Sequence, residues 1–393
     1  MSQDDAGYGS LEFTVRRAML AQLADWAMAA VPALPPGNGT RPVNGCFQVT
    51  VSPEFLRVAA TDQAKAVAAE IPAVLTQSSG QVYLPAKKLK SILGEAREGD
   101  VTVSVKGSTA VVTAGPSTWQ LRLPPADGYI GIPDLSAAVF APVSREALHW
   151  ALDTVRHAVG RDAGRPAFTQ VRVSGDATGR MFACATDSAQ FSSAPADGFP
   201  CDMLIPGAAL DDLLKLLAKS PADNAEVAEA GPYAVFRVGP VTLAARRLDA
   251  PFPDVDKMFL GLVKGNDMRL GVGKDELTAA LRRVRVNTDA TTSAVALIAD
   301  SDGGKRGRLT VTGRDKAGNS AEEVVPARWE GGQHLMVVNA VFLANLLAAH
   351  PGADCEFLVG KDRGKARAPL LLRDEEKQVT GTCPQMPPVL VGY

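Results

Sequence analysis

One seven-residue pattern recurs at a long and nearly constant interval, and it constrains the fold more than any other feature. Its first two copies, Leu56–Asp62 (LRVAATD) and Met181–Asp187 (MFACATD), read as apolar strands that end at a Thr-Asp turn. A weaker third copy is Leu309–Asp315 (LTVTGRD), and the three aspartates lie 125 and 128 residues apart. This interval is too long for a solenoid repeat and matches a normal domain size. The 393-residue chain is therefore predicted to contain three copies of one domain.

Other segments follow the same interval. A helix is predicted before each copy, and a strand-to-helix step is predicted after it. The helices are Val15–Ala30, Ser144–Val159 and Lys274–Val286, and the steps turn at Pro85, Pro206 and Asn339. Proline or Asn suits a helix start, where a missing donor is harmless or a side chain can cap. In the first helix Met19, Leu20, Leu23, Trp26, Ala27 and Ala30 fall near one apolar face.

These repeats predict an α+β fold made of three tandem domains, each with two helices backed by antiparallel sheets. The breakers Ile132–Asp134 and Phe252–Asp254 close the first two units, 120 residues apart. The predicted boundaries are a disordered leader at 1–10, domain 1 at 11–133, domain 2 at 134–256 and domain 3 at 257–393.

Composition indicates a soluble protein. The chain is 46% hydrophobic and 21% charged, and its apolar runs fall short of the roughly 18 residues that a membrane span needs. The polar start shows no signal-peptide core. The five cysteines are far apart and form no Cys-x-x-Cys pair, so we expect reduced thiols, a cytoplasmic location, and no metal or cofactor: Cys46, Cys184, Cys201, Cys355 and Cys383.

Charge is distributed unevenly. Six helix windows (14–30, 86–98, 144–161, 207–219, 274–286 and 339–350) carry a net charge of +6, which leaves −8 on the rest of the chain. Solvated helix faces would explain this bias, and so would a segregated basic surface that faces a polyanion.

The order of these motifs resembles one family. Three tandem two-helix units, the doubled Ala-Thr-Asp, the LPAK sequence of Leu84–Lys87 and the FPD sequence of Phe252–Asp254 together look like the bacterial DNA polymerase III β subunit, the DNA sliding clamp. The resemblance covers roughly residues 11–387. It implies a head-to-tail homodimer, a ring of six similar domains that encircles duplex DNA and tethers polymerase and other replication or repair proteins as a processivity factor. The strand Val101–Val105 and the region Val286–Ile298 are predicted to join the two chains.

The resemblance also implies a DNA-binding lining. Lysine and arginine would attract phosphates weakly and without sequence preference. The candidates are Arg16, Arg17, Arg41, Lys87, Lys88, Lys90, Arg145, Arg156, Arg161, Arg165, Lys215, Lys219, Arg282 and Arg283. About half are expected to face the pore, and Asn339–His350 carries no Lys or Arg at all.

A peptide pocket between domains two and three is implied as well, for short linear segments of polymerase and clamp-loader subunits. By motif it includes Phe168, Thr186, Ser188, Gln190, Phe191, Pro253, Lys257, Met258, Gly381, Cys383, Pro384, Gln385 and Met386. Two stretches depart from the family. Ser188-Ala189-Gln190 replaces the usual glycine and basic residue, and the tail continues to Tyr393. These departures raise the alternative of a secondary clamp, or of a clamp-fold peptide-binding adaptor or decoy that need not encircle DNA.

Catalysis has little support in the sequence. The four histidines are scattered without metal or triad spacing, and Gly271–Lys274 lacks the frame of a P-loop. We therefore predict a protein that is not an enzyme, does not bind membranes, and has double-stranded DNA, replication proteins and a second copy of itself as partners.

Overall fold

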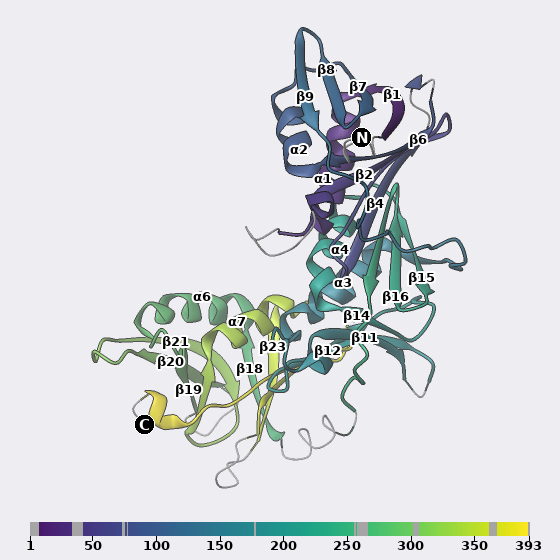
Figure 1. Ribbon diagram of the computed structural model, residues 1–393. Helices are drawn as coiled ribbons and strands as arrows, with labels where there is room; N and C mark the ends of the chain where they lie inside the picture. The colour runs from purple at the N-terminus through teal and green to yellow at the C-terminus, as the bar shows by residue number, and fades with distance from the viewer. Residues whose placement is uncertain are drawn as a thin grey trace. The chain divides into compact units, whose positions relative to one another are not determined.

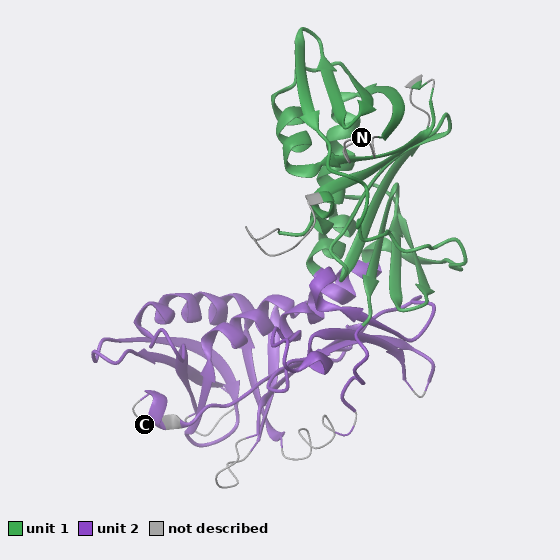
Figure 2. Cartoon of the chain, in the orientation of Figure 1, with its two compact units in different colours: residues 1–146, 211–247 green, residues 147–210, 248–393 purple. Residues whose placement is uncertain are grey.

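The computed structural model describes residues 8–33, 42–72, 75–76, 78–176, 178–254, 257, 266–301, 306–360 and 368–391. The chain divides into two compact units (Figure 2). Unit 1 comprises residues 1–146 and 211–247, and unit 2 comprises residues 147–210 and 248–393. The division passes through the second predicted domain.

One order of elements occurs three times along the described chain: a strand, a helix, three strands, a further strand, a second helix and three strands (Figure 1). A short extra strand, β5 (Leu75–Thr76), lies in the first repeat. The other elements of that repeat are β1 (Tyr8–Arg16), α1 (Arg17–Ala27), β2 (Cys46–Val51), β3 (Phe55–Thr61), β4 (Lys65–Pro72), β6 (Gly80–Pro85), α2 (Ala86–Glu95), β7 (Asp100–Gly107), β8 (Thr109–Ala114) and β9 (Ser117–Arg122).

The second and third repeats follow the same order. The second has β10 (Ala141–Ser144), α3 (Arg145–Val155), β11 (Gln170–Gly175), β12 (Met181–Thr186), β13 (Phe191–Pro195), β14 (Met203–Pro206), α4 (Gly207–Lys219), β15 (Asn224–Ala230), β16 (Tyr233–Val238) and β17 (Val241–Arg246). The third has β18 (Asn266–Gly273), α6 (Lys274–Val284), β19 (Ala294–Ser301), β20 (Arg306–Arg314), β21 (Ser320–Trp329), β22 (His334–Asn339), α7 (Ala340–Ala349), β23 (Asp354–Gly360), β24 (Leu370–Asp374) and β25 (Val379–Cys383).

One of the two sheets of unit 1 continues from the first repeat into the second. A five-stranded sheet has the order β5-β1-β7-β8-β9, and an eight-stranded sheet has the order β10-β15-β16-β17-β4-β3-β2-β6. In the larger sheet β4 of the first repeat pairs antiparallel with β17 of the second, with Val67 opposite Leu243.

Unit 2 repeats this arrangement. Its twelve-stranded sheet has the order β14-β11-β12-β13-β25-β24-β23-β18-β21-β20-β19-β22. Here β13 of the second repeat pairs antiparallel with β25 of the third, with Ser192 opposite Gly381. In both junctions, the strand that follows the Thr-Asp turn of one repeat (β4 or β13) pairs with the last strand of the next repeat (β17 or β25). The same backbone hydrogen-bonded contact is therefore made twice.

Local sequence explains the helix starts. Pro85 is the N-cap residue of α2, and the Asn339 side chain accepts hydrogen bonds from the backbone N–H of Val341 (2.8 Å) and Phe342 (3.2 Å) at the start of α7. The predicted proline and Asn starts are confirmed at these positions. On α1 the residues Leu20, Leu23, Ala24 and Ala27 are buried, whereas Met19 is 40% exposed, so the buried stripe is narrower than the predicted apolar face.

Three sequence-based expectations require correction. The leader was expected to extend to residue 10, but β1 begins at Tyr8. The first helix was expected from Val15, but that residue belongs to β1, because the strand pairs with β7 as far as Arg16 opposite Asp100. The strands predicted to join two chains are not sheet edges: β7 lies between β1 and β8, and β19 lies between β20 and β22.

Candidate functional site

The repeated Thr-Asp turn has a defined hydrogen-bonded geometry. In the second repeat Thr186 Oγ1 donates to the Gln190 carbonyl (2.6 Å), and Asp187 Oδ1 accepts from the backbone N–H of Ala189 (2.8 Å) and Gln190 (2.6 Å). Ser188 has φ +80°, in the left-handed region that favours glycine. The side chains of this turn hold their own backbone, which explains why Thr and Asp recur there.

The first repeat builds the same turn. Thr61 Oγ1 donates to the Lys65 carbonyl (2.9 Å), and Asp62 Oδ1 accepts from the N–H of Ala64 (3.0 Å) and Lys65 (2.9 Å). Gln63 takes the left-handed position, with φ +76°. Each turn directly precedes the strand that joins two repeats, β4 or β13, so the motif fixes where the junction begins.

The junction between β13 and β25 brings several predicted peptide-binding residues together. Phe191 lies opposite Thr382, and the Phe191 N–H donates to Thr382 Oγ1 (2.9 Å). A Cβ on Gly381 would lie 2.3 Å from Leu346 Cδ1, so a side chain there has no room without movement of the core. Burial raises the pKa of the Cys383 thiol, which is fully buried, so this cysteine is a packing residue and not an exposed thiol. The predicted residues Thr186, Ser188, Gln190, Phe191, Gly381 and Cys383 thus share one turn and its adjoining strand pair.

The chain after β25 packs on another part of the sheet in unit 2. The Gln385 side-chain amide donates to the Ala368 carbonyl (2.7 Å), and the Met386 N–H donates to the Val337 carbonyl of β22 (2.6 Å). Met386 also packs against a small cluster that includes Ala294, Ala296 and Val337. These contacts hold the tail against β19 and β22.

The remaining predicted pocket residues come from loops. Phe168 lies in a single 3-10 turn, Pro166–Phe168, with the Arg165 guanidinium 4.4 Å from its ring centre. Pro253 is half-buried, and Lys257 is exposed and paired with Asp254 (2.9 Å). Met258 lies outside the described residues.

Most of the predicted DNA-binding side chains are exposed. Three of them form ion pairs: Lys90 with Asp25 (3.0 Å), Arg156 with Asp153 (3.3 Å) and Arg16 with Asp100 (3.3 Å). Both side chains of each pair are exposed, so solvent screens the attraction between the charges. The exposed members are Arg16, Lys87, Lys88, Lys90, Arg156, Arg161, Arg165, Lys215, Lys219, Arg282 and Arg283. Arg41 lies outside the described residues.

Two predicted DNA-binding residues have structural partners instead. Arg17 keeps 19% of its side chain exposed, donates to the Leu93 carbonyl (2.8 Å) and pairs with Glu98. Arg145 donates to the carbonyls of Ala222 (2.7 Å) and Leu217 (2.9 Å), near the end of α4. Both side chains satisfy acceptors at helix ends, so their charge is explained by the fold.

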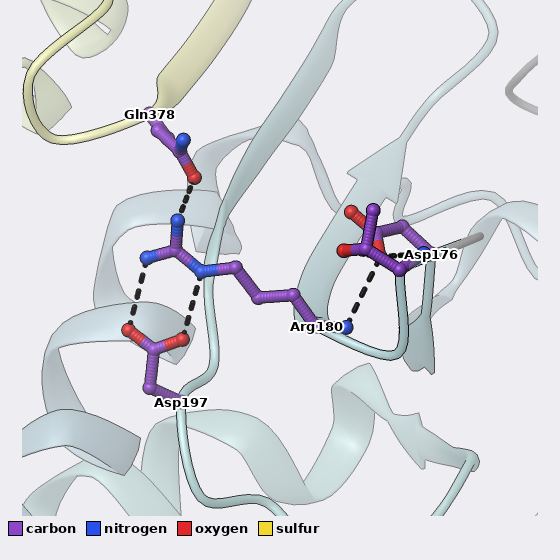
Figure 3. Close-up of polar contacts among 5 residues, drawn as sticks. Asp176, Arg180, Asp197 and Gln378 are labelled. Carbon is purple, nitrogen blue, oxygen red and sulfur yellow. Dashed lines mark hydrogen bonds and ion pairs between the residues drawn. The ribbon is translucent and has the colours of Figure 1, made fainter.

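Sequence reasoning missed Arg180, which forms an ion pair within the second repeat and a hydrogen bond to the third. Arg180 makes a two-point contact with Asp197 (3.0 and 3.1 Å) and also donates to the Gln378 side chain of the β24–β25 turn (Figure 3). Its backbone N–H donates to Asp176 Oδ1 (3.0 Å). The hydrogen bond from Arg180 lowers the pKa of Asp197. Nothing in the local pattern around Arg180 indicates partners that lie so far away along the chain.

The half-buried His157 is also absent from the predicted site. Its Nδ1 lies 3.0 Å from the Thr154 carbonyl, and Nε2 has no hydrogen-bond partner among the described residues. Burial lowers the pKa of His157, although the Thr154 carbonyl and the Asp187 charge act in the opposite direction. The net lowering of the pKa favours the neutral form of this histidine.

Within the described ranges no group of three or more His, Cys, Asp and Glu side chains could hold a metal ion. No helix in the same part of the chain is both long enough and apolar enough to cross a membrane.

The architecture defines a class of protein. It has three repeats, each with two helices and two sets of four strands, and sheets that continue across the junctions join the repeats. Solved structures share this fold. The chain superimposes on a β sliding clamp from Caulobacter crescentus with a TM-score of 0.85 at 21% identity, covering 97% of this chain and 100% of that one. A DnaN sliding clamp from Bartonella birtlesii bound to griselimycin gives a TM-score of 0.84 at 20% identity, covering 96% and 100%.

Sequence comparisons lead to the same family. Residues 11–133 match the family described as DNA polymerase III beta subunit, N-terminal domain. The β sliding clamp of Micrococcus luteus is 23% identical over 326 residues, 81% of this chain and 100% of its own. The beta sliding clamp homolog GriR of Streptomyces muensis is 23% identical over 362 residues, 91% of this chain and 93% of its own. The resemblance to the bacterial sliding clamp that the sequence predicts is confirmed, at 23% identity to these two proteins.

Proposed function

We propose that this protein is a DNA sliding clamp, in which two chains close head to tail into a ring around duplex DNA. The observation that carries the proposal is the repeated sheet junction. The strands β4, β13 and β21 occupy the same place in the three repeats, and so do the last strands β9, β17 and β25. Within the chain, β4 pairs with β17 and β13 pairs with β25. This leaves β21 of the third repeat and β9 of the first without a junction partner among the described strands. A third junction of the same kind, between two chains, would pair β21 of one chain with β9 of the other. A head-to-tail contact that closes on itself gives a finite ring.

The first of these strands is a free edge. β9 pairs only with β8 and ends the five-stranded sheet. The turn before it, Gly115-Pro116-Ser117, corresponds to Gly239-Pro240-Val241 before β17, and both strands end in arginine, Arg122 and Arg246. Unpaired backbone groups on such an edge are a template for another strand.

The second strand is free over most of its length. β21 pairs with β20 from Ser320 to Arg328, but it pairs with β18 only from Ala327 to Trp329. The segment 320–326 therefore has one ladder partner among the described strands, and it carries Val324, which is 56% exposed. An exposed β-branched residue on a strand edge suits burial against a second chain.

The test of ring closure is the solution mass. Wild-type protein should have twice the 41.2 kDa mass of one chain. Val324→Lys should shift the equilibrium to the monomer, because a buried lysine without a partner is unfavourable in the new sheet. The matched control is Val139→Lys: Val139 is 86% exposed and lies outside β9 and β21, so this variant should keep the dimer mass. Dimer loss in both variants, or in neither, contradicts the assignment of the edges.

The exposed cations on α2, α4 and α6 support a weak, mobile contact with phosphates in the ring. The protein should stay on closed circular DNA and leave the same DNA once it is linearised, and retention on both or on neither would reject a topological link. Replacing Lys87, Lys88 and Arg282 by Gln should reduce the slope of log affinity against log salt by up to about 2.7. An unchanged slope would remove these residues from the lining.

We further propose that the turn at Thr186–Phe191, with the β13–β25 junction, belongs to a binding site for short linear peptides of polymerase and clamp-loader subunits. Two features distinguish this surface from the usual turn of the family, which carries glycine and a basic residue. Ser188 takes the left-handed position in the turn, and the tail packs on the sheet at Met386. Met258→Ala should weaken binding of a polymerase-derived peptide, and Met19→Ala, at a residue on α1 that is 40% exposed, serves as its control. Equal affinity for wild type and Met258→Ala would contradict the site.

The match to a clamp homolog over 91% of the chain favours one alternative, a clamp-fold adaptor that binds peptides without encircling DNA. Such a protein would bind the peptide, remain a monomer and be lost equally from circular and linear DNA. In either role the protein would act in the cytoplasm as a binding protein, without catalysis.

A further inference from the structure

A groove of about 590 Å³ lies in unit 1, on the helix side of the eight-stranded sheet. Its walls are α1 and α4, with Lys90 of α2 at the rim. Its floor is apolar, formed by the buried strand residues Val67, Val241 and Leu243, and Leu216 adds a buried apolar side chain from α4. Because strand side chains alternate between faces, the intervening residues Ala66, Ala68, Thr242 and Ala244 point to the other face of the same sheet, where they line a separate cavity. The groove is thus a built feature of the β4–β17 junction.

Trp26 gives the groove an aromatic wall. The indole is half-buried on α1, and the Lys219 ammonium of α4 lies 5.6 Å from its ring centre. The flat face of a partly exposed tryptophan can stack on a planar ligand. The volume also falls in the range of about 300–1,000 Å³ that small-molecule sites occupy.

The rim of the groove is basic. Lys90, Lys215 and Lys219 line it, together with Asp25 and Asp212. Asp25 is paired with Lys90 (3.0 Å), and Asp212 is paired with Lys65 and lies 3.8 Å from Lys215. The carboxylates are thus held by lysines, and the lining keeps a net positive charge next to the indole. An aromatic face with lysines around it is the arrangement by which proteins bind unpaired nucleotides.

We propose that this groove binds single-stranded nucleic acid, with an unpaired base stacked on Trp26 and adjacent phosphates held by Lys90, Lys215 and Lys219. A duplex cannot use the same contact, because its bases are stacked inside the helix. The inference adds a second mode of nucleic-acid binding to the proposed function, one that depends on the groove of one chain and not on a closed ring.

The test compares two probes on the full-length protein: a labelled oligothymidylate of about 12 nucleotides and a duplex of the same length. Trp26→Leu keeps an apolar side chain but removes the stacking face, so it should weaken oligothymidylate binding about five- to hundred-fold. Duplex binding should stay within about two-fold of wild type. An oligothymidylate affinity that is unchanged, or that falls equally with that of the duplex, overturns the proposal.

A second variant keeps the test decisive if Trp26→Leu is poorly folded. Lys90→Gln with Lys219→Gln changes two exposed side chains and should reduce the salt slope for oligothymidylate by about 1.4, at about 0.7 for each phosphate contact. The matched control, Lys106→Gln on β7, is exposed and outside the groove, and should leave that slope unchanged. Equal slopes for the double variant and the control would also overturn the proposal.

Retention on circular DNA separates the two hypotheses. If wild type and Trp26→Leu both stay on closed circles while only wild type binds oligothymidylate well, both hypotheses stand. If wild type leaves closed circles but still binds oligothymidylate through Trp26, the ring is wrong and the groove is right.

Discussion

The ion pair between Lys65 and Asp212 is expected to stabilise unit 1 by a measurable amount. Lys65 begins β4 in the first repeat and Asp212 lies on α4 in the second, and their side chains keep only 13% and 20% of their exposure. Asp212→Asn removes the charge and nearly keeps the shape, leaving the Lys65 ammonium partly buried without its counter-ion. A hydrogen bond between charged groups contributes about 1.5–3 kcal/mol, and breaking a fully buried pair costs about 3–5 kcal/mol. With the residual exposure taken into account, we expect a loss of about 2 kcal/mol.

The assay is thermal or urea unfolding of the whole protein, followed for the transition of unit 1. A loss of about 2 kcal/mol lowers the midpoint by roughly 4–8 °C in a unit of this size. Lys65→Met should cost a similar amount, and the double variant should cost less than the sum, with a coupling of at least about 1 kcal/mol. The matched control is the pair of Arg57 with Glu70 on β3 and β4, 2.9 Å apart with side chains 50% and 41% exposed, where removal should cost below about 1 kcal/mol. Equal effects for the two pairs would refute the argument from burial.

Three further outcomes follow from single positions in unit 2. Ser188→Gly should raise the free energy of unfolding by up to about 1 kcal/mol, because glycine adopts φ +80° without a Cβ clash. Gln63→Gly, at φ +76°, should act the same way in unit 1. A loss of stability in both variants would contradict backbone strain at these positions. Gly381→Ala should cost about 1–3 kcal/mol, since its Cβ would meet Leu346 in the core, whereas Gly332→Ala meets nothing within 4 Å and should be close to neutral. Burial lowers the pKa of His157 in the folded state. The contribution of His157 to stability is therefore complete above the unfolded pKa of about 6.5 and decreases as the pH falls below that value. A His157→Gln variant that loses as much stability as wild type between pH 7 and 5 would contradict this prediction.

The sequence by itself determined the repeat, the element types and the turn chemistry. The Thr-Asp turns could be predicted because Thr186 and Asp187 bond to the backbone within four residues, and the Asn339 cap because its partners are two and three residues away. These are local interactions, so a short window of sequence contains both partners. The order of motifs over three repeats was enough to predict the family, which the comparisons confirm.

Only the tertiary structure decided which strands are edges and which charges remain available. β7 resembles β9 in its alternation of buried and exposed residues, yet it is enclosed because β1 pairs with it from about 90 residues earlier in the chain. Arg145 resembles the other helix arginines in sequence, but carbonyls more than 70 residues away use its donors. Trp26 fitted an apolar helix face, and only the approach of α4 and β17 makes it the wall of a groove. In each case the partner is distant in sequence, and pairing over such distances is decided by how the whole sheet assembles and not by the residues nearby.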